Sequence, residues 1–275
     1  MLINTVVLFL RDALPIFVLL SLLRVYASPK WRHLLAGVGV GIMLAALVVA
    51  NQHTVSQWYQ GSGYELLKCI TLITAYMLAA WLIIKEPKHV YWLAATIVAV
   101  FVVPRSADFS VFVVGFWFQK DALVPILLGT TLGLGICVSV AVLLDVLLSS
   151  VTKSAVVRTA FALFVAGQIA NVILLLQQID WLADPGPLWN MGVIIADESE
   201  YGHLLKVLIG YEAAPSSFYL LTLFIALLLP LLMQLYAYTC SAIAVQNRST
   251  KHDHPSRHAA RFQPSACYDN SYRRS

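Results

Sequence analysis

Long apolar stretches separated by short polar ones make up most of the chain, and this pattern predicts membrane-spanning helices. A helix needs roughly 20 predominantly apolar residues to cross the hydrocarbon core of a bilayer. Strands with alternating polar and apolar residues are missing from the sequence, which argues against a membrane β-barrel. Seven stretches are long enough for a spanning helix, at residues 2–26, 34–51, 64–84, 108–128, 130–148, 156–178 and 218–244.

One more apolar segment, residues 91–103, bears on this count. It is only about as long as a re-entrant or interfacial segment, and it ends at Pro104 and Arg105. Counting it as a separate span would reverse the orientation of every later helix. We therefore predict that it is an amphipathic or partly embedded lead-in to the fourth span.

Lysine and arginine residues divide the connections between spans into two kinds. Basic residues follow the first, third, fifth and seventh spans, whereas residues 52–63 contain none and residues 183–217 hold five acids against Lys206. Because basic connections stay in the cytoplasm, we predict an external N-terminus and a cytoplasmic C-terminus. Residues 245–275 are basic and polar, as in a disordered cytoplasmic tail.

The composition supports a membrane protein. Only 12% of the 275 residues are charged and 60% are hydrophobic, whereas soluble domains carry about 25% charged residues. We therefore expect an all-α, multi-pass protein of the cytoplasmic (inner or plasma) membrane, with the lipid bilayer as a partner. The sequence has no metal-binding cysteine spacing, nucleotide loop or catalytic Ser/His/Asp set. We expect neither an enzyme, nor a nucleic-acid partner, nor a permanently bound cofactor.

A basic residue followed by an acid, Ala-Leu and a nearby proline occurs twice inside apolar stretches. The first copy is Arg-Asp-Ala-Leu-Pro at residues 11–15, and the second is Lys-Asp-Ala-Leu-Val-Pro at residues 120–125. A charge at the centre of a membrane helix costs roughly 2.5–3.5 kcal/mol on insertion scales. Two such pairs in matching contexts therefore indicate the functional part of the molecule.

The two motifs also predict an internal repeat. They lie in the first and fourth predicted spans, so that residues 1–84 and 88–180 form two copies of three spans each, followed by a seventh helix at 217–244. Because three is odd, the copies have opposite orientations, as in the inverted repeats of secondary transporters. We thus expect one transmembrane domain, residues 1–244, and the tail.

The charged motifs have a defined chemistry if the first and fourth spans are packed together. Adjacent helical residues point about 100° apart, so we expect Arg11 and Asp12 to find partners on other helices, as we do for Lys120 and Asp121. A proline donates no backbone hydrogen bond, so Pro15 frees the carbonyl of Arg11, and Pro125 frees that of Asp121. Carboxylates and free carbonyls suit a hard or borderline metal ion. The alternative is an interhelical salt-bridge network without a transport role.

Other polar residues in apolar stretches are weaker candidates. Glu65 opens the third span and is either a ligand at the mouth of the pathway or an interfacial charge. The sixth span carries Gln168, Asn171, Gln177 and Gln178. Such side chains usually form hydrogen bonds between helices, and the alternative is a polar lining of the pathway.

Several stretches resemble the oxidase-dependent iron permease family, the plasma-membrane iron permeases of fungi and the iron uptake permeases of bacteria. That family carries an Arg-Glu-Gly-Leu-Glu motif in the first and fourth of seven spans, and the counterparts here are residues 11–15 and 120–124. The most specific match is residues 203–216, which is similar to the family's entry into its seventh span. Further matches are Glu65, residues 74–81 and residues 164–182, and the resemblance covers roughly residues 3–240.

The resemblance implies a permease that imports iron, or a similar divalent metal ion, as the transported ion. Asp12, Asp121 and Glu65 would be metal ligands, and Arg11 and Lys120 would be counter-charges. A homo-oligomer and an extracytoplasmic iron-binding protein or oxidase as partner are compatible with this function.

The motifs depart from the family pattern at acidic positions. The first glutamate of each motif is an aspartate here, and the second is replaced by Pro15 or Val124. The acid of a Gln-Glu pair in the family's sixth span is Gln178. The alternative function is therefore a non-transporting membrane subunit or scaffold for a periplasmic or surface iron-binding protein or oxidase.

Overall fold

The computed structural model describes residues 2–85, 90–117, 123–151, 154–197 and 199–252. Over these residues the fold is built from helices, with one isolated β-bridge between Pro187 and Ser216. The elements are α1 (Leu2–Ala27), α2 (Trp31–Ala50), α3 (Gln52–Gln57), the 3-10 helix η1 (Trp58–Gly61), α4 (Gly63–Lys85), α5 (Val90–Trp117), α6 (Leu123–Ser149), α7 (Ser154–Gln178), α8 (Glu200–Ile209) and α9 (Ser217–His252).

Seven of these helices are long and apolar enough to cross a membrane, which confirms the predicted all-α fold and its number of spans. The chain forms two units, Met1–Gln234 and Leu235–Ser275, and the seven helices begin in the first unit. α9 continues to His252, past the predicted end of the seventh span at residue 244. Residues 253–275 of the predicted tail lie outside the described residues.

The fourth spanning helix differs from the prediction. Residues 91–103 are not a lead-in but the first half of α5, which runs without a break from Val90 to Trp117. Pro104 removes one backbone donor from this helix, and a helix packed among others tolerates this loss. The fifth span is α6, which begins at Leu123. The total of seven is unchanged, because both helices begin earlier in the chain than the predicted spans at 108–128 and 130–148.

The helices of the first unit form an inner and an outer group. The most apolar parts of α1, α5 and α7 are 53%, 61% and 56% buried, against 22%, 17% and 22% in α2, α6 and α9. The outer helices expose large aliphatic side chains such as Leu35 and Met43 of α2 and Leu143 and Leu147 of α6. Apolar faces of this kind suit contact with lipid.

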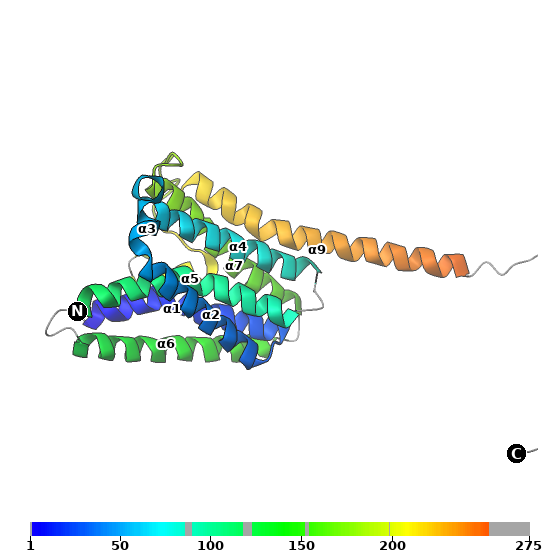
Figure 1. Cartoon of the computed structure of the whole chain (residues 1–275). Helices are drawn as coiled ribbons and strands as arrows, with labels where there is room; N and C mark the ends of the chain where they lie inside the picture. The colour runs from blue at the N-terminus through cyan, green and yellow to red at the C-terminus, as the bar shows by residue number, and fades with distance from the viewer. Residues whose placement is uncertain (1, 86–89, 118–122, 152–153, 198, 253–275) are drawn as a thin grey trace, which may run out of the picture. The chain divides into compact units, whose positions relative to one another are not determined.

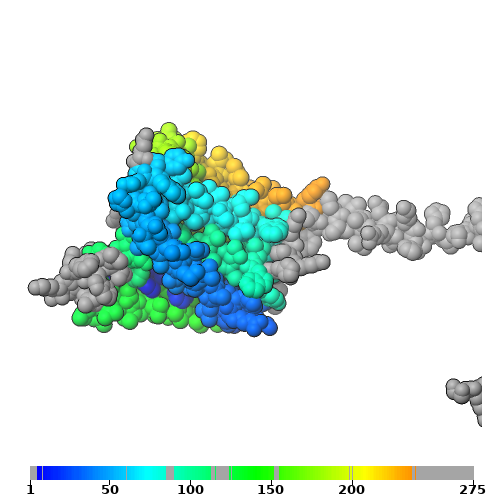
Figure 2. All heavy atoms as spheres, viewed as in Figure 1, coloured from blue at the N-terminus to red at the C-terminus, as the bar shows by residue number. Residues whose placement is uncertain are grey.

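Two close helix pairs cover the inner group: α1 lies along α6, and α2 lies along α5 (Figure 1). In the space-filling view α2 and α3 extend across the face of the first unit (Figure 2). Small residues allow close helix packing at Gly41 and Gly133. A Cβ on Gly41 would lie 2.7 Å from that of Val102 in α5, and one on Gly133 would lie 2.7 Å from a phenylalanine ring of α1. Gly39 and Gly135 have nothing within 4 Å of a Cβ.

The contact between α2 and α5 predicts a difference between two neighbouring glycines. A Cβ on Gly37 would lie 2.5 Å from the backbone oxygen of Ala95, so we expect Gly37→Ala to lower the unfolding free energy by about 1–3 kcal/mol. Gly39→Ala is the matched control, because a Cβ there has no neighbour within 4 Å. Thermal unfolding of the purified variants in detergent gives their melting temperatures. Equal melting temperatures for Gly37→Ala and Gly39→Ala would contradict the close contact between α2 and α5.

Candidate functional site: a charged cavity among five helices

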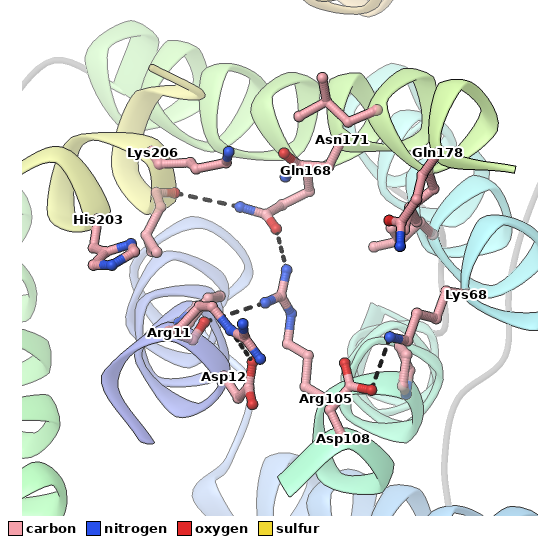
Figure 3. A pocket seen from close by; sticks show the side chains of 16 residues that line it. Arg11, Asp12, Lys68, Arg105, Asp108, Gln168, Asn171, Gln178, His203 and Lys206 are labelled. Atoms are coloured by element: carbon pink, nitrogen blue, oxygen red, sulfur yellow. Dashed lines mark hydrogen bonds and ion pairs between the residues drawn. The ribbon is translucent and has the colours of Figure 1, made fainter. Parts of the chain in front are cut away.

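A cavity of about 420 Å³ lies among α1, α4, α5, α7 and α8, and polar and charged side chains line much of it (Figure 3). Each of the five helices contributes at least one such side chain. Those that Figure 3 labels are Arg11, Asp12, Lys68, Arg105, Asp108, Gln168, Asn171, Gln178, His203 and Lys206. We call this the charged cavity.

Arg105 of α5 joins four of these helices. Pro15 lies inside α1, and because a proline has no N–H, the carbonyl of Arg11 loses its helical donor. Nη1 of Arg105 donates a hydrogen bond to this carbonyl at 3.4 Å, and Nη2 donates to Oε1 of Gln168 in α7. Nε2 of Gln168 in turn donates to the carbonyl of Val207 in α8 at 3.4 Å. The carbonyl freed by Pro15 is thus bonded to a guanidinium.

Asp12 is buried at the wall of the charged cavity, with 6% of its surface exposed. Its Oδ1 accepts a hydrogen bond from Nε of Arg11 at 3.1 Å. We expected the partner of Asp12 to lie on another helix, and this expectation was wrong for Oδ1, which is bonded to the neighbouring side chain of Arg11. Oδ2 of Asp12 is buried and has no hydrogen-bond partner in the described part of the chain. One carboxylate oxygen is left without compensation for the loss of water.

Asp108 of α5 forms the second acidic centre of the cavity. Its Oδ1 accepts a hydrogen bond from the hydroxyl of Tyr64 at 2.8 Å and lies 2.8 Å from Nζ of Lys68. Nζ of Lys68 also lies 4.6 Å from the centre of the Tyr64 ring. Tyr64 and Lys68 are both on α4, so this cluster joins α4 to α5.

The short helix α8 brings two basic or titratable side chains, His203 and Lys206, to the cavity. α8 is capped at its start by the hydroxyl of Ser199 and ends at Gly210, whose φ of 69° is left-handed. A Cβ on Gly167 of α7 would lie 2.8 Å from Cα of Gly210, so only glycine permits this approach. The end of α8 is therefore pressed against α7. Nζ of Lys206 forms an ion pair of 2.6 Å with Glu212.

The structure places some of the predicted site residues at the cavity and others elsewhere. Glu65 lies in the first turn of α4 and does not line the charged cavity. Gln177 instead donates to the hydroxyl of Ser216 at 3.3 Å. Pro125 is in the first turn of α6, where a missing N–H removes no helical bond. Lys120 and Asp121 lie outside the described residues. The predicted residues at the cavity are Arg11, Asp12, Pro15, Gln168, Asn171 and Gln178.

The prediction missed Lys68, Arg105, Asp108, His203 and Lys206. Arg105 and Asp108 are three residues apart, a spacing that places both on one face of a helix. The spacing indicates a shared helical face only if residues 91–103 and Arg105 belong to the same spanning helix. His203 and Lys206 have the same spacing, in a segment that the sequence indicated as a connection.

The cavity is rich in cations relative to metal ligands. The described residues contain no group of three or more His, Cys, Asp or Glu side chains placed to hold a metal ion. Several oxygen atoms that a cation would need already accept hydrogen bonds from protein N–H groups. They are Oδ1 of Asp12, the carbonyl of Arg11 and Oε1 of Gln168.

The bonding of Arg105 predicts a large effect on stability. Arg105→Ala leaves a backbone carbonyl and an amide oxygen without their donor, and we expect a loss of about 1.5–3 kcal/mol of unfolding free energy. Arg105→Lys should recover only part of this lost free energy, because an ammonium does not have the planar fork that reaches both acceptors. Arg32→Ala, at an exposed arginine of α2, is the control. Thermal unfolding in detergent measures all three, and wild-type stability of Arg105→Ala would contradict the network.

No protein-family model, curated protein or solved structure matches the chain. The resemblance to iron permeases therefore depends on short stretches of the sequence alone. What the geometry provides is a cavity with charged side chains from four helices, inside a bundle that suits a multi-pass membrane protein.

Proposed function

We propose that the protein is a membrane permease and that the charged cavity is its substrate site. The observation that supports this most directly is the convergence of Arg11, Lys68, Arg105 and Lys206, from four helices, on one cavity within the bundle. Charged side chains inside membrane bundles are costly and mark the pathways of ions and other solutes. A purely structural salt bridge needs no cavity of this size.

The packing of the helices supports the inverted repeat that such a permease requires. A twofold axis that exchanges α1, α2 and α4 with α5, α6 and α7 converts the α1–α6 pair into the α5–α2 pair, and both pairs are close. The same operation maps the contacts α1–α5 and α4–α7 onto themselves, and both occur. In secondary transporters the substrate site lies at the interface of the repeats, where α1 and α5 meet here.

With this symmetry, we propose a different second motif from the one predicted. In the first repeat the charged pair is Arg11 and Asp12 of α1, and in the second it becomes Arg105 and Asp108 of α5. Of residues 120–125, which we expected to hold the second pair, residues 120–122 lie outside the described residues and residues 123–125 begin α6. Asp108 thus takes the part proposed for Asp121.

The distribution of basic residues favours an external N-terminus, and with this orientation the charged cavity lies toward the outside. Beyond it, toward the cytoplasm, lies a small cavity with a mostly apolar lining that includes Leu19, Phe101 and Phe164, and Gln168 lines both cavities. The rings of Phe101 and Phe164 are 5.9 Å apart, centre to centre. A second large cavity, lined by Tyr26 and Arg158 among others, follows at the other end. This arrangement fits an outward-open state with an apolar closure.

Iron is the cargo that the family resemblance implies, and it is the first cargo to test. The alternative, a non-transporting partner subunit, is suggested by the missing motif glutamates and by the acids in residues 183–217. Asp184 and Asp197 accept backbone hydrogen bonds from Gly186 and Ala213, and Glu212 pairs with Lys206. These acids therefore stabilise the connection itself, and we treat the partner subunit as one outcome of the transport experiment.

Transport is tested with the purified protein in liposomes, with radioactive iron outside as ferrous ion or as ferric citrate. We expect influx above that of empty liposomes, and we expect Asn171→Trp to reduce it about tenfold or more because the indole fills part of a cavity that a ligand needs. Ile70→Trp is the control, since Ile70 is 55% exposed on the outer face of α4.

Two results would contradict the proposal. Influx that is unchanged in Asn171→Trp would place the pathway elsewhere. A folded wild-type protein that moves no iron in either form, but retains a soluble iron-binding protein or oxidase through purification, would favour the partner subunit.

A further inference from the structure

The charges around the cavity do not balance. Three of its cations have a carboxylate partner: Arg11 pairs with Asp12, Lys68 with Asp108, and Lys206 with Glu212. Arg105 differs, because the hydrogen bonds of its guanidinium go to the neutral oxygens of Arg11 and Gln168. The cavity therefore has one more positive charge than these pairs neutralise, and it lies on the most central residue of the network.

The hydrogen-bonding groups around the cavity also favour an anion, because several of them are donors. Nε of Arg105 is buried and has no hydrogen-bond partner within the described residues. Nζ of Lys206 and the ring of His203 lie on the same side of the cavity as Arg11, and Asn171 adds an amide from α7 (Figure 3). Oδ1 of Asp12, the carbonyl of Arg11 and Oε1 of Gln168 already accept hydrogen bonds, whereas Oδ2 of Asp12 has no donor in the described part of the chain. One such oxygen is a poor ligand set for a bare cation, which takes about six oxygen ligands, whereas an anion accepts from donors that are already present.

We infer that the charged cavity binds an oxyanion, a carboxylate or phosphate group, between Arg105, Arg11 and Lys206. Guanidinium groups bind both oxyanions through two parallel N–H bonds, and a neighbouring lysine adds a point charge. A cavity of about 420 Å³ is in the size range of small-molecule sites and accommodates a small organic acid or an anionic metal chelate. As an account of the cargo, this inference rests on the proposed permease function. Iron would then enter as an anionic chelate.

Binding is measured without transport, by calorimetry and thermal unfolding of the full chain in detergent with citrate, phosphate, sulfate or ferrous ion. We expect citrate or phosphate to bind and to raise the melting temperature, and a preference for one of them identifies the carboxylate or the phosphate as the recognised group. We expect Lys206→Gln/Glu212→Gln to weaken binding about tenfold, because it removes one charge-assisted contact while keeping the net charge unchanged. Arg32→Gln, at an exposed arginine, should leave binding unchanged.

Asp12→Asn separates an anionic from a cationic ligand. Without the carboxylate, Arg11 is no longer neutralised, so the affinity for citrate or phosphate should stay the same or rise severalfold. A site for a bare metal ion would instead lose its buried carboxylate and bind ferrous ion at least about tenfold less tightly. Asp180→Asn, at an exposed residue outside the cavity with a φ of 58°, is the matched control.

The outcomes distinguish this inference from the permease proposal. Anion binding that weakens in the Lys206/Glu212 variant supports the inference even if liposomes show no flux, in which case the permease proposal fails alone. Ferrous influx without binding of any tested anion overturns the inference and leaves the permease standing. If neither the Lys206/Glu212 variant nor Arg11→Gln changes anion binding, the anion binds outside the charged cavity, and this result also overturns the inference.

Discussion

The hydrogen bond from Arg105 to the carbonyl of Arg11 is the interaction on which the interior of this bundle depends. A proline in α1 leaves that carbonyl without its helical donor. The guanidinium of α5 supplies the donor and bonds to Gln168 at the same time. One side chain thereby fixes the separation of α1, α5 and α7, and through Gln168 that of α8.

The sequence predicts the number of spanning helices well because a run of apolar residues has few alternatives to a membrane helix. It predicted the boundaries of the fourth and fifth helices poorly. Pro104 and Arg105 look like a helix end in isolation, since proline weakens a helix and a charge favours the interface. In the bundle both are inside α5, where α1 and α7 supply the hydrogen-bond acceptors of Arg105. Such compensation is a property of the tertiary structure.

The sequence likewise predicted only part of the candidate site. Arg11, Asp12 and Pro15 are conspicuous because charges and a proline in the middle of an apolar run need an explanation. Lys68 and Lys206 give no such signal, since each lies near the start of a span or in a connection, where charges are common. The helix α8 did leave local signs, with Ser199 at its start and Gly210 at its end. Its position against the cavity depends on the contact between Gly210 and Gly167, which no local pattern encodes.

In the proposed permease, the same network would relate ligand binding to helix movement. Alternating access in inverted-repeat transporters requires one repeat to move against the other about the substrate site, and here α1 and α5 meet where Arg105 donates to the carbonyl of Arg11. An anion that engages the guanidinium competes with this neutral oxygen, because a charged acceptor forms the stronger hydrogen bond. Occupancy of the cavity would then weaken the bond between the two repeats, and an empty cavity would retain it. A ligand shifts a conformational equilibrium only through a difference in affinity for the two states, and this competition provides such a difference.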